Sequence, residues 1–160
     1  MITMHVRKKS NPLNVFHRVV IAIQALIAGN DVDRFALVLS SGSHGWIYTK
    51  DGTASDQIAR HEAYHVHQAM LAGGWLWRWR YITSRQWRLI YEAQAYAYGF
   101  KAEFDIHAPF IARDTIRRVA PIYWFGEITT EDAVLIVTLA SDAILGEDLS
   151  IEIIDESRLV

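Results

Sequence analysis

The residues best suited to chemistry are His61-Glu62-Ala63-Tyr64-His65, which form the pattern HExxH. Residues four apart in a helix lie on one face about one turn apart, so His61 and His65 can present imidazole nitrogens to one Zn²⁺. Glu62 lies too far round such a helix to be a third ligand, but it can accept a proton from water at the metal. The pattern predicts a metal-dependent hydrolase with Glu62 as its general base.

A catalytic zinc site needs a third protein ligand, and Glu92 is the strongest candidate downstream. It lies in a predicted helix that opens at Thr83-Ser84-Arg85-Gln86, a capping box, and small alanines flank it that would let two helices approach closely. The alternative is a surface ion pair with Arg88, a contact worth only a few tenths of a kcal/mol. We favour the ligand. The next candidates are Glu103 and His107.

A helix around the motif is predicted independently by its end signals. Thr53 can cap its start, with Asp56 at the third helical position, and Gly73-Gly74 is a natural stop. The motif therefore falls in the middle of the helix, where the backbone is most rigid.

Further elements follow downstream, and together they predict one α+β domain over residues 1–160, mainly helical with a small sheet. The expected elements are a helix over about Phe110 to Val119, a helix capped at Thr129-Thr130-Glu131-Asp132 that reaches about Leu145, and a strand from Ser150 to Asp155.

Composition excludes few functions but is informative about partners. The net charge of −2 gives no global attraction for nucleic acid, and the absence of Cys rules out a thiolate zinc site. It also fits a reducing compartment, so we expect a cytoplasmic protein. Residues 1–28 superficially resemble a secretion signal, but Arg18 and Gln24 interrupt it, and a buried first helix or strand over 19–28 is favoured.

Tryptophan and arginine alternate in the segment Trp75 to Tyr81, just after the motif helix. If this segment is extended or irregular, Trp77 and Trp79 face the protein while Arg78 and Arg80 face solvent. We favour this packing. The alternative is an interaction surface for nucleic acid, a membrane interface or a partner protein.

Taken together, His61 to Gln68 (HExxHxxQ), the Trp/Arg-rich connector and Tyr91 to Tyr96 resemble the minimal gluzincins, small thermolysin-like zinc metallopeptidase domains. The resemblance covers about residues 35–105 and implies a zincin-like fold. It implies that His61, His65 and Glu92 bind zinc and that Glu62 is the base. It also implies a hairpin before the motif helix, with strands at Phe35 to Leu39 and Gly45 to Thr49. An extended peptide substrate would pair with the strand around Trp46 to Thr49.

The chain departs from that family beyond the ligands. Gln94 stands where many relatives carry a second acid, and Tyr96 stands where thermolysin has the Asp that orients a histidine. The sequence therefore does not identify the residues that hydrogen-bond the two histidine ligands and fix their tautomers. The candidates for the side chain that would stabilise the oxyanion of the transition state are Tyr64, Tyr96 and His107.

We expect a peptide or protein substrate and, as the second possibility, a protein partner in an assembly. Nucleic acid and membrane are not expected partners. Two other functions compete with this one. The first is a structural or adaptor protein, for example of a phage assembly, in which the site is catalytically idle. The second is a nucleic-acid-binding module that uses the Trp/Arg connector.

Overall fold

The computed structural model describes residues 1–19, 22, 37–120, 126–146 and 148–156. Its elements in chain order are β1 (Ile2–Lys8), β2 (Leu37–Ser41), β3 (His44–Thr49), α2 (Asp56–Ala72), α3 (Gly74–Thr83), α4 (Arg85–Phe104), η2 (Asp105–His107), α5 (Ala108–Val119), α6 (Thr130–Leu145) and β4 (Ile151–Asp155). A short helical stretch also covers residues 15–19. The predicted α+β class is confirmed. The apolar run at 19–28 lies mostly outside the described residues.

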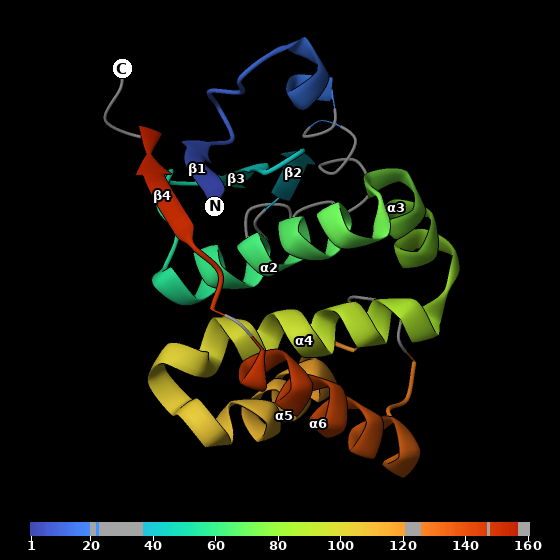
Figure 1. Cartoon of the computed structure of the whole chain (residues 1–160). Helices are drawn as coiled ribbons and strands as arrows, with labels where there is room; N and C mark the ends of the chain where they lie inside the picture. The colour runs from blue at the N-terminus through green and yellow to red at the C-terminus, as the bar shows by residue number, and fades with distance from the viewer. Residues whose placement is uncertain (20–21, 23–36, 121–125, 147, 157–160) are drawn as a thin grey trace.

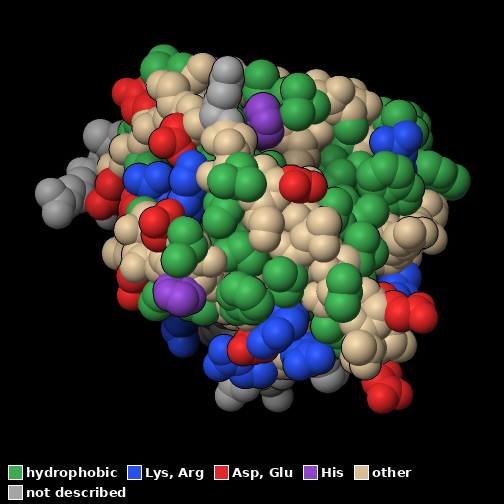
Figure 2. Space-filling model, turned by 60° about the horizontal axis from the view of Figure 1, so that its bottom comes forward, with side chains coloured by type: hydrophobic (Ala, Val, Ile, Leu, Met, Phe, Trp, Pro, Cys, Tyr) green, Lys and Arg blue, Asp and Glu red, His purple; other side chains and the backbone are tan. Residues whose placement is uncertain are grey.

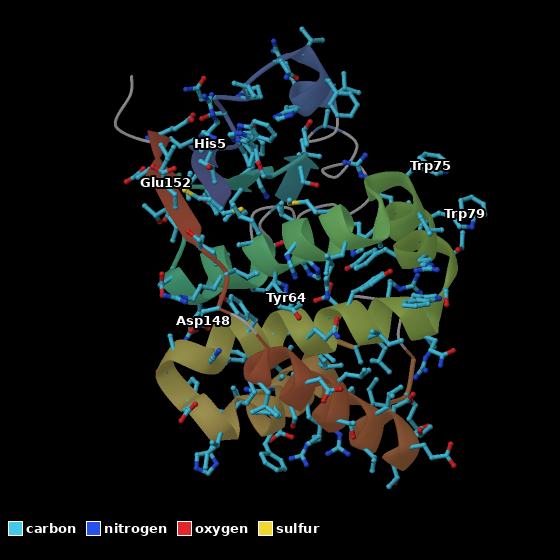
Figure 3. The ribbon with its side chains drawn as sticks, viewed as in Figure 1. His5, Tyr64, Trp75, Trp79, Asp148 and Glu152 are labelled. Atoms are coloured by element: carbon cyan, nitrogen blue, oxygen red, sulfur yellow. The ribbon has the colours of Figure 1, made fainter. Side chains whose placement is uncertain are left out.

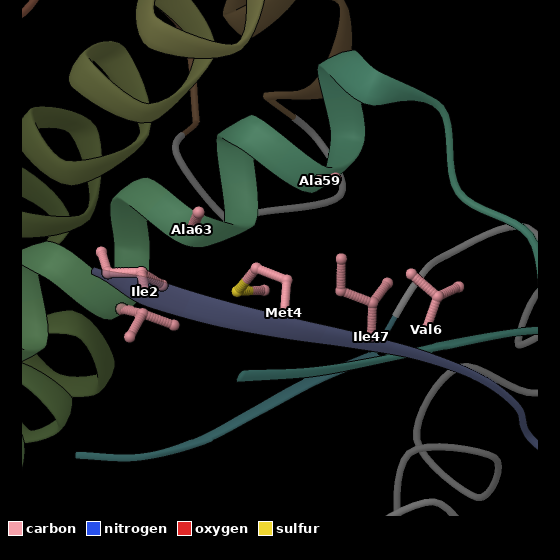
Figure 4. Packing of buried hydrophobic residues seen from close by; sticks show 7 residues of the cluster. Ile2, Met4, Val6, Ile47, Ala59 and Ala63 are labelled. Atoms are coloured by element: carbon pink, nitrogen blue, oxygen red, sulfur yellow. The ribbon is translucent and has the colours of Figure 1, made fainter. Parts of the chain in front are cut away.

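The four strands form one sheet in the order β2-β3-β1-β4. β1 runs parallel to both β3 and β4. β2 and β3 form the predicted antiparallel hairpin, although Phe35 and Ala36 of the predicted first strand lie outside the described residues. β1 alternates apolar and polar side chains, and its Ile2, Met4 and Val6 are buried against Ala59 and Ala63 of α2 (Figure 4). β1 was not predicted, because only three apolar positions alternate there and the basic residues beside them resemble the start of a leader.

The helices lie below the sheet in successive layers (Figure 1). α2 contacts β1 and β3 on one side and α4 on another, and α5 and α6 pack on α4. A second apolar core, which contains Leu89, Ile116 and Ile136, joins α4 to α5 and α6. No helix among the described residues is both long enough and apolar enough to cross a lipid bilayer.

Small side chains bring α2 and α4 together at the motif. Ala93, Ala95 and Ala97 are fully buried in α4, as the predicted close approach requires. A Cβ added at Gly99 would lie 2.9 Å from the Gln57 carbonyl oxygen and 3.2 Å from Cβ of His61. Any larger residue at position 99 would push α4 away from the motif helix.

Two predicted caps are displaced along the chain. Ser55, rather than Thr53, caps α2 and accepts a hydrogen bond from the backbone N–H of Ile58. The reason is the preceding turn, in which the Thr53 N–H is donated to Asp51. Ser84, rather than Thr83, caps α4.

The later predicted ends agree more closely with the structure. Thr129 and Asp132 form a capping box at the start of α6, and Gly73 ends α2 with a φ of 76°. The predicted helix at 110–119 starts two residues earlier, at Ala108, and the predicted last strand forms β4.

The connector after α2 is a helix, so the condition under which Trp77 and Trp79 would both face the protein, an extended or irregular segment, is not met. The Gly73 carbonyl accepts a hydrogen bond from the Trp77 N–H, which starts α3 directly after α2. Positions 77 and 79 are about 200° apart in a helix and cannot share a face. Trp77 is half-buried as predicted, whereas Trp79 is exposed, contrary to the prediction.

The strand that was expected to pair with an extended substrate, β3, lies inside the sheet and not at its edge. β3 pairs with β2 on one side and with β1 on the other, so Trp46, Ile47 and Tyr48 already have strand partners on both sides. The strand at this end of the sheet is β2, and no described strand pairs with its outer side. Its Ser40 carbonyl accepts a hydrogen bond from Arg78 of α3 at 2.9 Å.

Candidate metal centre

Two histidines of α2 and one carboxylate of α4 meet between these helices. One ligand atom from each of His61, His65 and Glu92 lies within 4.8 Å of the others. Nε2 of His61 is 3.5 Å from Oε2 of Glu92, and Nε2 of His65 is 3.4 Å from Oε1 of Glu92. All three residues are buried, and Glu92 is only 1% exposed.

This donor set fits a zinc ion. Four ligands at about 2.0–2.1 Å in a tetrahedron are separated by about 3.3–3.4 Å, which is close to the two histidine–carboxylate distances. Oε2 of Glu92 is buried without a hydrogen-bond partner, an uncommon state for a carboxylate oxygen. A cation between the three side chains would satisfy that oxygen.

An amide pair fixes the orientation of His65. Nδ1 of His65 lies 2.9 Å from Oε1 of Gln68, and since an amide oxygen only accepts, Nδ1 carries the proton and Nε2 is left facing Glu92. The Gln68 amide group donates in turn to Oε1 of Gln94 at 2.9 Å and to the Tyr91 carbonyl at 3.1 Å. Gln68 and Gln94 therefore provide the outer-shell support that was open in the sequence.

His61 is held differently. Its ring packs on Tyr96, with 4.3 Å between the ring centres, and the two motif histidines meet edge to face. The Ala95 carbonyl favours a proton on His61, although buried Nδ1 has no regular hydrogen bond. Tyr96 thus restrains this histidine by packing, at the position where thermolysin has an Asp.

α3 forms a wall of the centre that was not predicted from the sequence. The Tyr81 hydroxyl donates to Oε1 of Glu92 at 2.5 Å, and Trp77 stacks on Tyr81 and lies against His65. In a helix, Trp77 and Tyr81 are four residues apart and share one face, so a helical assignment for this segment would have identified both.

Burial and mutual charge set the ionisation of the three residues. Burial, with His65 nearby, lowers the pKa of His61 to about 3. Burial also opposes charge on His65, but the Glu92 carboxylate outweighs it and raises the pKa of His65 to about 9. Burial works against a charged Glu92, yet the attraction of His65 keeps its pKa below the usual value. Near neutral pH, without metal, the centre therefore holds neutral His61, protonated His65 and ionised Glu92.

Glu62 lies beside the three residues without joining them. Its side chain is half-buried and closely surrounded by protein atoms. Burial, reinforced by Glu92 and opposed by His65, raises the pKa of Glu62 to about 7. A carboxylate with this pKa can both accept and return a proton near neutral pH.

The remaining candidates from the sequence lie elsewhere. Arg88 donates to the Tyr81 and Ile82 carbonyls and does not pair with Glu92. Glu103 accepts a hydrogen bond from Gln57 at the far end of α4, and His107 follows it in η2. Tyr64 packs on Tyr98 and His67, away from the two motif histidines. Of the three proposed oxyanion donors, only Tyr96 touches the centre.

Replacing Gln68 with Ala is expected to lower zinc affinity about 10-fold to 100-fold, because His65 loses the acceptor that fixes its tautomer. Isothermal titration of the metal-free protein with zinc measures this change. Gln86→Ala, at an exposed position in the first turn of α4, is the control and should bind zinc as the parent does. Unchanged affinity in Gln68→Ala would remove this residue from the centre.

No protein-family model, curated protein or solved structure matches this chain.

Proposed function

We propose that this protein is a zinc-dependent hydrolase of the gluzincin type that cleaves peptide bonds. The observation that carries the proposal is the convergence of His61, His65 and Glu92, with nitrogen–oxygen distances suited to zinc and with Glu62 beside them. A zinc ion held there would polarise a scissile carbonyl and make a neighbouring water more acidic.

The chain's own residues divide the remaining work. Glu62 accepts a proton from the attacking water and returns it to the leaving amine, a role that suits its pKa of about 7. Gln68 keeps Nδ1 of His65 protonated, and the Tyr81 hydroxyl holds Glu92 in place. Trp77 and Tyr81 of α3 keep water away from the His65 side of the centre.

Zinc binding is expected to release about one proton per chain near pH 7. His61 is already neutral and Glu92 already ionised, whereas His65 is protonated below its pKa of about 9 and must lose that proton to become a ligand. Affinity should therefore rise with pH up to about 9 and level off above it. Titration calorimetry in buffers of different ionisation enthalpy counts the protons, and a heat that is independent of buffer would contradict this charge state.

A peptide-library cleavage screen tests the proposed activity. The protein is assayed after zinc loading, after removal of metal by a chelator, and after zinc is restored. The proposal expects cleavage only in the two zinc-containing states. A zinc-loaded protein that cleaves none of the peptides, or cleavage that survives the chelator, counts against it.

A structural protein with an idle site is the second candidate, and one contact favours it. The Tyr81 hydroxyl already donates a hydrogen bond to Oε1 of Glu92, and both histidines lie next to the same carboxylate. The cluster can therefore also stabilise the fold as a buried polar network without metal. The two candidate functions differ in whether they require Glu62. A hydrolase needs it as a general base, whereas a structural protein with an idle site does not. Zinc-independent folding together with the absence of cleavage would favour the structural role.

A further inference from the structure

α3 is apolar on both of its faces. Trp77 and Tyr81 face the candidate metal centre, while Trp75, Trp79 and Ile82 lie along the opposite side, which we term the outer α3 face. These three side chains are 78%, 57% and 73% exposed, and Trp75 and Trp79 point away from the protein in Figure 3. They are spaced i, i+4 and i+7, so they form one continuous stripe. A helix that is apolar all round is normally covered on both sides.

The outer α3 face continues toward the end of α2. Met70 and Leu71 at the end of α2 are exposed beside it, as is Leu76. Between the helices, a Cβ added at Gly73 or Gly74 would meet no atom within 4 Å. The turn between α2 and α3 is therefore uncrowded and leaves the start of α3 accessible.

The sequence that contains α3 carries charge of one sign, although Asp132 of α6 pairs with Arg85 just after the end of α3. Residues 63–91 contain no Asp or Glu, although the whole chain has a net charge of −2. Arg78 and Arg80 flank the stripe; Arg78 donates to the Ser40 carbonyl, and Arg80 lies 4.3 Å above the Trp87 ring. No described carboxylate forms an ion pair with either guanidinium. The face built by α5 and α6 differs, because acidic and basic side chains both lie on it (Figure 2).

We propose that the outer α3 face docks on an anionic lipid surface. Tryptophan rings favour the boundary between headgroups and acyl chains, where the aliphatic tips of Leu71 and Ile82 can enter the apolar layer. Arg78 and Arg80 can extend their charged ends to lipid phosphates from either side of the stripe.

Two features favour lipid over the other occupants. A bilayer accepts an exposed stripe of apolar side chains without a shape of its own, whereas a protein partner must supply a complementary surface. Single-stranded nucleic acid stacks on aromatic rings and gains little from exposed leucine and isoleucine. The inference goes beyond the proposed hydrolysis and does not depend on the metal.

Co-sedimentation with vesicles tests the proposal on the full chain. The parent protein is mixed with vesicles of phosphatidylcholine alone and with vesicles in which part of that lipid is replaced by phosphatidylglycerol. We expect binding to the anionic vesicles and at least about tenfold weaker binding to the neutral ones. Trp75→Ser with Trp79→Ser should reduce binding at least about tenfold, and Arg78→Gln with Arg80→Gln should do the same for the anionic vesicles.

The matched control is Val134→Ser with Leu145→Ser, which removes two exposed apolar side chains from α6 and should leave binding unchanged. Thermal unfolding and zinc titration of every variant check that the fold and the metal centre are intact. The proposal is overturned if the parent binds neither vesicle or if the Trp variant binds as the parent does. It is also overturned if the parent is a dimer that the Trp variant converts to monomer, or if the face binds a single-stranded oligonucleotide in preference to vesicles.

Discussion

Glu62→Gln is expected to lower peptide hydrolysis by about 10²-fold to 10⁴-fold while leaving the fold and the zinc content unchanged. The amide has nearly the same shape as the carboxylate but cannot accept the proton of the attacking water. Glu62 does not belong to the group of three ligand atoms, so its replacement removes no ligand. Steady-state cleavage and zinc stoichiometry, measured on the same preparations, give the two readouts.

Glu103→Gln is the matched control, since Glu103 is an exposed carboxylate on α4 that pairs with Gln57. It should retain the parent's activity. A Glu62→Gln protein that cleaves as fast as the parent would show that another group takes the proton, and the role proposed for Glu62 would be wrong.

His65→Ala is expected to weaken zinc binding by about 10³-fold or more, because two ligands remain where a catalytic site uses three. It also leaves Glu92 buried beside one histidine instead of two, so the metal-free protein should unfold at a lower temperature. Competition with a fluorescent zinc chelator measures the affinity over this range.

His67→Ala lies on the same helix and serves as the control. The His67 ring packs on Tyr64 and not on the ligand group, so zinc affinity should be that of the parent. Glu92→Gln extends the test, since it keeps the size of the side chain and removes only the charge that attracts His65 and the metal. Equal zinc affinity in the parent, His65→Ala and Glu92→Gln would place the metal elsewhere.

Local patterns predicted the helices that carry the site. HExxH with a glycine stop fixed the position of the motif helix, and Glu92 among alanines predicted the close approach that the structure has at α2 and α4. These signals are local in sequence, because helix caps and small-residue spacing involve residues within a few turns of one another.

Contacts between distant segments could not be predicted in the same way. Tyr81 reaches Glu92 only because α3 folds back after Gly73, and alternating Trp and Arg suggested an extended segment instead. The position of β3 inside the sheet depends on β1, a strand more than thirty residues away whose short alternation carries little signal. Gln68 stood in the motif, but its bond to Gln94 depends on the packing of α2 against α4.

The most direct test of the metal centre is anomalous diffraction at the zinc absorption edge from crystals of the zinc-loaded protein. We expect one strong peak per chain, at about 2.0–2.2 Å from Nε2 of His61, Nε2 of His65 and a carboxylate oxygen of Glu92. A peak bound by other residues, or none between α2 and α4 in a protein that contains zinc, would contradict it.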